Sequence, residues 1–173
     1  MEVSLLDKTS LKLKSKSASF VVDPFEKLSK TQTDGVIILS KEGTDLAKVA
    51  DYRVVIGSPG EYEVGGVKVS GIDIEGNTVY DFKIDNIDVI LARTSYLTKV
   101  SDKIKEYDIA IFNVDSEINQ TVVTALEPRV VILYGENVAE AVKSLGFENV
   151  QNVQKYAVTQ DKLPEEMQVI FLK

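Results

Sequence analysis

The chain has 173 residues, 44% of them hydrophobic, and a net charge of −7, which is typical of one globular domain with a single core, here residues 1–173. It has no cysteine and no histidine, which excludes disulfides, thiolate chemistry and the commonest general base and metal ligand. The negative charge disfavours nucleic acid and anionic lipid as partners, and the lack of a signal pattern or a bilayer-spanning apolar run leads us to expect a cytoplasmic protein that binds no membrane.

The first part of the chain is predicted to form short strands joined by polar turns. Apolar residues alternate with polar ones within Met1–Leu6 and Leu11–Val22, which is the pattern of half-buried strands. Lys12, Lys14 and Lys16 recur at every second position, so they lie on one strand face. We interpret them as a solvated face; a ridge that binds phosphate is the alternative.

A second group of elements lies between this region and the middle of the chain. Asp23-Pro24 ends the preceding strand, because proline has no N–H for a strand ladder. The continuous apolar run Val36–Leu39 predicts a strand covered on both faces. A short helix is expected over Thr44–Ala50, with Thr44 as its N-cap, and a strand is expected over Tyr52–Ile56.

Residues Gly57–Ile72 predict a sharp turn followed by a β-hairpin. Apolar and polar residues alternate in both arms, over 61–64 and over 67–70. Gly65-Gly66 between the arms can adopt the positive φ angles that a two-residue hairpin turn requires. On these grounds alone the segment is a hairpin with no function attached to it.

The second half of the chain changes from strands to alternating strands and helices. Its apolar residues first recur at period two and then, in several segments, at helical spacing. Strands followed by alternating strands and helices predict an α/β (α+β) fold in which helices cover sheets. The expected elements are a hairpin of Thr78–Ile84 and Ile87–Leu91 joined at Asp85-Asn86, a helix Thr98–Tyr107, a strand Ile109–Val114, a helix at about 118–126, a strand Arg129–Tyr134, a helix Glu136–Leu145 stopped by Gly146, an extended segment Gln154–Val158 and a strand Val169–Leu172.

The hairpin sequence Pro-Gly-Glu-Tyr-Glu-Val-Gly-Gly-Val-x-Val-x-Gly-Ile, residues 59–72, resembles that of small bacterial and archaeal metallo-β-lactamase-fold hydrolases, the branch that includes ascorbate-6-phosphate lactonase-like proteins. The strand Pro128–Ile132 and the late segment Asp161–Glu166 are similar to further landmarks of these proteins. The resemblance implies a four-layer αββα sandwich, with two mixed sheets face to face and helices outside. It also implies metal ligands on the loops that follow the strands.

The positions where the resemblance places metal ligands carry other residues here. The first histidine position corresponds to Lys8, and the His-x-His-x-Asp-His motif falls on Lys41–Leu46, of which Asp45 alone is kept. The family's bridging aspartate corresponds to Thr94 and its last histidine to about Gly135. A catalytic zinc needs about three protein ligands and an open position. We therefore predict no catalytic residues, no metal and no cofactor.

The resemblance implies a vestigial cleft that lacks the family's metal ligands. Lys8 or Lys41 is predicted to neutralise Asp23 or Asp45, because an unpaired buried carboxylate is costly. Lysines exposed on remodelled loops are the alternative. The expected cleft residues are Lys8, Asp23, Lys41, Asp45, Thr94 and Gly135.

Other chemistries find less support in the sequence. No serine-nucleophile motif, phosphate-binding loop or dinucleotide fingerprint occurs. Asp7, Asp23, Asp45 and Asp73 could together hold Mg²⁺, Mn²⁺ or Ca²⁺, although such residues are more often caps and turn formers. The predicted function is that of a catalytically inactive metallo-β-lactamase-fold protein, a structural or protein-interaction module that forms a homo-oligomer or binds an unknown protein partner. The alternative is a hydrolase or small-molecule binder that uses the altered cleft.

Overall fold

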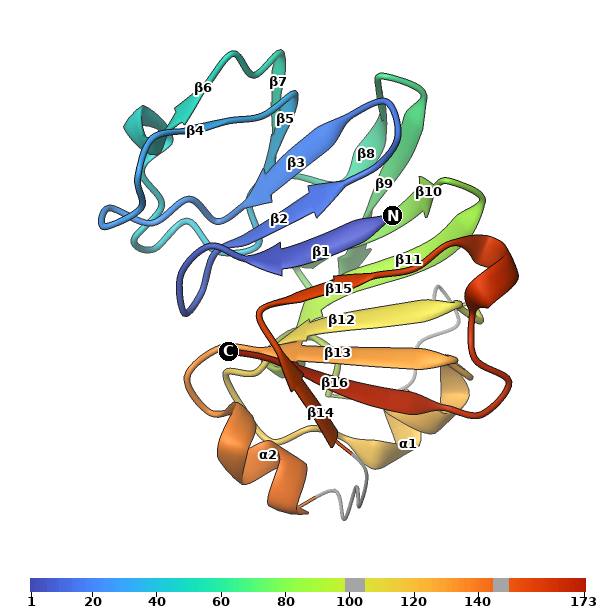
Figure 1. Cartoon of the computed structure of the whole chain (residues 1–173). Helices are drawn as coiled ribbons and strands as arrows, with labels where there is room; N and C mark the ends of the chain where they lie inside the picture. The colour runs from blue at the N-terminus through green and yellow to red at the C-terminus, as the bar shows by residue number, and fades with distance from the viewer. Residues whose placement is uncertain (99–104, 145–149) are drawn as a thin grey trace.

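Two mixed β-sheets pack face to face and form most of the molecule (Figure 1). The computed structural model describes residues 1–98, 105–144 and 150–173. Side chains from both sheets share one core, in which Phe20 and Phe82 form an edge-to-face ring pair with centroids 5.8 Å apart. The predicted α/β (α+β) sandwich of two mixed sheets is confirmed.

The first sheet combines antiparallel and parallel pairing. Its strands, in spatial order, are β15 (Lys155–Ala157), β1 (Glu2–Leu5), β2 (Leu11–Lys14), β3 (Ser19–Val22), β5 (Gly35–Ile37) and β7 (Val54–Ile56). Pairing is antiparallel from β15 to β3 and parallel from β3 to β7. The carboxyl ends of β3, β5 and β7 therefore lie at the same edge of the sheet.

The second sheet begins as an antiparallel meander and continues as a parallel sheet. Its strands, in spatial order, are β14 (Val150–Val153), β16 (Gln168–Leu172), β13 (Val130–Tyr134), β12 (Ile109–Asn113), β11 (Ile87–Arg93), β10 (Asn77–Ile84), β9 (Val67–Ile74) and β8 (Gly60–Val64). Both residues of the turns Gly65-Gly66, Glu75-Gly76 and Asp85-Asn86 have positive φ, as two-residue hairpin turns require. The two hairpins predicted from sequence are confirmed.

Helices cover only the outer face of the second sheet in the part of the chain that the structure describes (Figure 1). They are α1 (Gln120–Ala125) and α2 (Val138–Ser144), and neither is long and apolar enough to cross a bilayer. The outer face of the first sheet carries a smaller cluster of Val21, Leu28, Val36 and Val49. This side of the sandwich includes the short ribbon of β4 (Thr31–Gln32) and β6 (Val49–Ala50).

The helix predicted over Thr44–Ala50 is wrong. The chain there forms a single 3-10 turn, η1 (Leu46–Lys48), followed directly by β6. Asp45, not Thr44, is the N-cap, since its carboxylate accepts a backbone N–H of the turn at 3.0 Å. Pairing of β6 with β4 holds the next residues extended, so the turn ends before it becomes an α-helix.

Two other predicted helices reach residues that the structure does not describe. Most of Thr98–Tyr107 lies outside the described residues, and 105–107 has no regular structure, with Tyr107 buried. The helix predicted over Glu136–Leu145 begins at Val138, and its predicted stop, Gly146, lies outside the described residues. The extended segments near the C-terminus are confirmed as β15 and β16.

Gly71 is required by a close approach of two backbone segments. A Cβ atom at this position would lie 2.5 Å from the Ser58 carbonyl oxygen and 3.0 Å from Pro59 Cα. We expect Gly71→Ala to lower the free energy of unfolding by about 1–3 kcal/mol, because backbone atoms must shift to admit the methyl group. Urea unfolding measures this, with the exposed Lys68→Ala of the same strand as the matched control. Equal loss in both variants would contradict the explanation.

Candidate functional site

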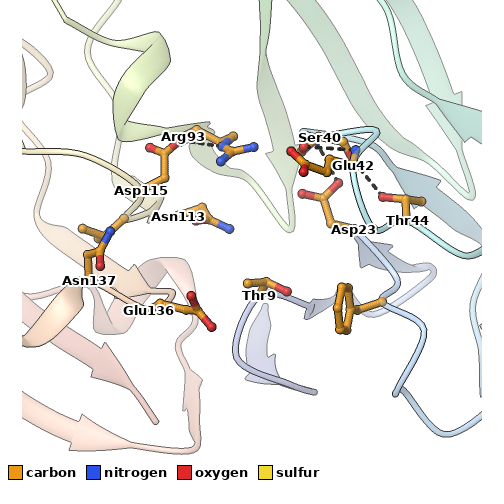
Figure 2. A pocket seen from close by; sticks show the side chains of 13 residues that line it. Thr9, Asp23, Ser40, Glu42, Thr44, Arg93, Asn113, Asp115, Glu136 and Asn137 are labelled. Carbon is orange, nitrogen blue, oxygen red and sulfur yellow. Dashed lines mark hydrogen bonds and ion pairs between the residues drawn. The ribbon is translucent and has the colours of Figure 1, made fainter.

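A cavity of about 330 Å³ opens where strands of both sheets end (Figure 2). One wall follows β3 and β5 and includes the β1–β2 loop; it contains Thr9, Asp23, Phe25, Ser40 and residues 42–44. The opposite wall is formed at the ends of β11, β12 and β13; it contains Arg93, residues 113–115, Glu136 and Asn137. Carboxyl ends of parallel strands are the general location of ligand sites in α/β sheets. The cavity is therefore the first candidate for a functional site.

Asp23 is the most deeply buried acid in this cavity. It directly follows β3 with a positive φ of 42° and is only 8% exposed. Its Oδ1 accepts the backbone N–H groups of Leu39 at 2.7 Å and Ser40 at 3.1 Å. Burial nevertheless raises its pKa to about 7, because desolvation disfavours the charged form. Near neutral pH this carboxyl group can accept or donate a proton.

Arg93 and Asp115 form a tightly bonded unit on the opposite wall. Arg93 Nε donates to Asp115 Oδ2 at 2.7 Å. The Arg93 Cζ atom lies over the Tyr96 ring, 5.7 Å from the ring centroid. Asp115 also accepts hydrogen bonds from Thr94 Oγ1 at 2.9 Å and from Ser95 N and Oγ at 2.9 and 2.6 Å. Burial opposes ionisation of Asp115, but these donors and the Arg93 charge hold its pKa below the usual value.

A buried phenol lies close to this wall. Tyr134, at the carboxyl end of β13, is fully buried, and its hydroxyl has no hydrogen-bond partner among the described residues. Burial and the nearby charge of Asp23 raise its pKa well above the ordinary value, so it is a neutral donor. The next residue, Gly135, has φ of +114°, and a Cβ there would lie 3.1 Å from Asn113 Oδ1. Gly135 thus allows the β13 loop to pack against the end of β12.

The residues predicted for the cleft surround the cavity, but only Asp23 lines it. Thr94 is buried, and its hydroxyl donates a hydrogen bond to Asp115. Asp45 is the N-cap of η1. Lys8 and Lys41 are exposed. The predicted neutralisation by a lysine is thus replaced, for Asp23, by two backbone N–H donors and the positive charge of Arg93.

Sequence reasoning missed most of the residues that do line the cavity. Arg93, Asn113 and Asp115 end or closely follow two predicted strands, and Glu136 closely follows a third. The sequence pattern that could have identified these lining residues is a polar residue at the carboxyl end of a buried strand. The sequence predicted Lys8 as a cleft residue, whereas the neighbouring Thr9 of the same loop lines the cavity.

Two acids of the cavity, Asp23 and Asp115, are bonded within the protein. Among the residues that the structure describes, no group of three or more His, Cys, Asp or Glu is placed to hold a metal ion. The carboxylate of Asp115 is bonded to Arg93, Thr94 and Ser95, and Asp23 Oδ1 is bonded to backbone N–H groups.

The bonds to Asp115 are expected to stabilise the fold at neutral pH. We expect Asp115→Asn to lower the free energy of unfolding at pH 7 by about 1.5–3 kcal/mol, as for hydrogen bonds to a charged group. The folded pKa is lowered, so this contribution is present above the unfolded pKa and is lost as the pH falls through the folded pKa. Denaturation at pH 7 and at pH 3 tests both statements; a penalty that does not shrink in acid would contradict them.

No family model matches the sequence, and no curated protein matches it. Among solved structures, the chain is similar to a candidate Zn-dependent hydrolase of the metallo-β-lactamase superfamily from Thermotoga maritima, with 21% identity, a TM-score of 0.78, and 99% of this chain and 98% of that chain covered. It is also similar to a candidate metal-dependent hydrolase from Parabacteroides distasonis, with 14% identity, a TM-score of 0.60 and coverages of 83% and 87%. A third, from Veillonella parvula, has 13% identity, a TM-score of 0.58 and coverages of 86% and 94%. These likenesses show that the chain has the metallo-β-lactamase fold.

Proposed function

We propose that this chain is a catalytically inactive protein of the metallo-β-lactamase fold, which acts as a structural or protein-interaction module. The observation that carries the proposal is the bonding of two acids of the cavity, the buried Asp23 and the half-buried Asp115. Asp115 is bonded to Arg93 and to the residues next to it, and Asp23 is bonded to backbone N–H groups. These bonds engage both carboxyl groups within the protein. The histidine-free and cysteine-free composition supports the same proposal.

A second copy of this chain is the partner that we propose for the module. β7 is an edge strand of the first sheet, and an edge strand offers unpaired N–H and C=O groups to another chain. Tyr52 and Val55, which are 37% and 38% exposed, place apolar surface at this edge. Pairing of two β7 edges would cover both the polar backbone and the apolar side chains.

The test of inactivity is a hydrolysis screen of untagged protein purified without chelator. Phosphodiester, lactone and thioester substrates are tested with and without added Zn²⁺, Mn²⁺ or Mg²⁺, and light scattering over a wide concentration range gives the molar mass in parallel. We expect no turnover above that of the metal in buffer, and a mass that rises to that of a dimer. Metal-dependent turnover that Asp23→Ala abolishes would contradict the proposed inactivity, and a monomer at every concentration would contradict self-association.

A second candidate function is the binding of a small molecule in the cavity without a metal. The observation that favours it is the cavity itself, in which a fixed cation, Arg93, faces acids on the other wall (Figure 2). Sites of about 300 Å³ and more with a few placed polar groups are typical of small-molecule binding. This candidate is compatible with inactivity, because binding needs no reaction.

A further inference from the structure

We infer that the cavity binds a small zwitterion of the α-amino-acid class, with the ligand's carboxylate on Arg93 and its ammonium group attracted by the free acids Glu42 and Glu136 on the two walls. The inference rests on the second candidate function, which is binding without a metal. It names the chemical class of the ligand and the residues that recognise each end of it.

Arg93 is held in a position suited to bind a carboxylate. Its Nε is bonded to Asp115 at 2.7 Å, and its guanidinium plane lies over Tyr96. These two contacts fix the orientation of the guanidinium, while its terminal nitrogen atoms point into the cavity (Figure 2). The terminal N–H groups of a guanidinium match the geometry of a carboxylate, with which they form paired charge-assisted hydrogen bonds.

The acids of the cavity leave a surplus of negative charge. The charge of Arg93 is already balanced by Asp115. Within the described residues, no lysine or arginine forms an ion pair with Glu42 or with Glu136, although both line the cavity. The ammonium group of a ligand therefore meets acids that have no ion-pair partner among the described residues, whereas a phosphate or a polyanion would only add negative charge.

The remaining lining residues favour a small polar ligand over a long polyamine. Thr9, Asn113 and Asn137 offer neutral hydrogen-bonding groups between the charged ones, and a volume of about 330 Å³ is at the lower end of the range for small-molecule sites. A polyamine has no anionic group for Arg93 and would bring further positive charge against it. A zwitterion satisfies both signs of charge in one molecule.

The experiment is calorimetric titration of the whole chain with each proteinogenic L-amino acid, with EDTA present. At least one is expected to bind with a stoichiometry of one per chain. The amine that lacks its carboxylate and the acid that lacks its amino group are each expected to bind about tenfold more weakly or worse, as for a lost charge-assisted interaction. Absence of binding by the whole panel, or equal affinity for the amine alone, would overturn the inference.

Matched variants locate the binding in the cavity. Glu136→Gln and Arg93→Gln are each expected to weaken binding about tenfold or more, whereas Arg53→Gln, a change to an arginine that is 71% exposed, should leave it unchanged. Since Glu136 forms no ion pair within the described residues, its variant keeps the test valid where Arg93→Gln fails to fold. Unchanged binding in Glu136→Gln would refute the assignment. A parallel titration has Zn²⁺ in place of EDTA, and binding seen only there would contradict the proposed metal-free function while leaving the cavity as a ligand site.

Discussion

Replacing Asp23 with asparagine is expected to make the protein more stable at alkaline pH and to flatten its stability between pH 4 and pH 8. Burial raises the pKa of Asp23 from 3.8 to about 7. Between these values the folded state holds a proton that the unfolded state has released, so the free energy of unfolding falls as the pH rises. The full difference between the folded and unfolded pKa of Asp23 corresponds to about 4 kcal/mol in the free energy of unfolding. Asparagine has no proton to release and removes this dependence.

The asparagine variant is a close test because its side-chain oxygen can still accept the two backbone N–H groups of Leu39 and Ser40. Urea unfolding from pH 4 to pH 8 should show the difference in stability between variant and wild type growing by about 4 kcal/mol in favour of the variant. Asp161→Asn is the control: a hydrogen bond from Thr159 lowers the pKa of that exposed carboxyl, so any effect has the opposite sign. A difference that does not change with pH would contradict the raised pKa that burial gives to Asp23.

Replacing Phe82 with alanine is expected to be among the most destabilising single changes in the chain. Phe82 is fully buried on β10 and packs edge-to-face against Phe20 on β3, so the pair joins the two sheets. We expect a loss of about 3–5 kcal/mol in the free energy of unfolding, from lost burial and from the cavity that remains. Denaturant unfolding of the variant gives this value directly.

A double-mutant cycle with Phe20→Ala separates the ring contact from burial. The interaction energy is expected to be about 0.5–1.5 kcal/mol, as for aromatic pairs of this geometry. Val21, on the opposite face of β3, packs in the smaller outer cluster, so Val21→Ala with Phe82→Ala should be close to additive. Coupling through Val21 as strong as through Phe20 would contradict the sheet packing described here.

The elements that sequence predicted correctly are those whose cause is local. Gly65-Gly66 and Asp85-Asn86 adopt the positive φ angles that fix two-residue hairpins, and the alternation in the arms fixes which face is buried. The helix predicted over Thr44–Ala50 failed because a non-local pairing, β6 with β4, holds the end of that segment extended. The placement of β15 beside β1 was equally inaccessible, since those strands are distant in sequence.

The candidate site was less predictable than the fold because it is assembled from loops of both sheets. Asp23 was identified, and residues next to Lys8 and Lys41 do line the cavity. The bonds from Arg93, Thr94 and Ser95 to Asp115 could not be foreseen, because they join residues about twenty positions apart through the parallel pairing of β11 and β12. That pairing decides which polar side chains meet at the edge of the sheet.

The metal content of the purified chain tests the central claim most directly. Untagged protein, prepared without chelator and passed through gel filtration, is analysed by inductively coupled plasma mass spectrometry. We predict less than about a tenth of an equivalent of any transition or alkaline-earth metal, because the described ranges 1–98, 105–144 and 150–173 offer no group of three or more His, Cys, Asp or Glu placed to hold one. Close to one equivalent, retained through gel filtration and lost in Asp23→Ala, would contradict the account and make this cavity a metal site.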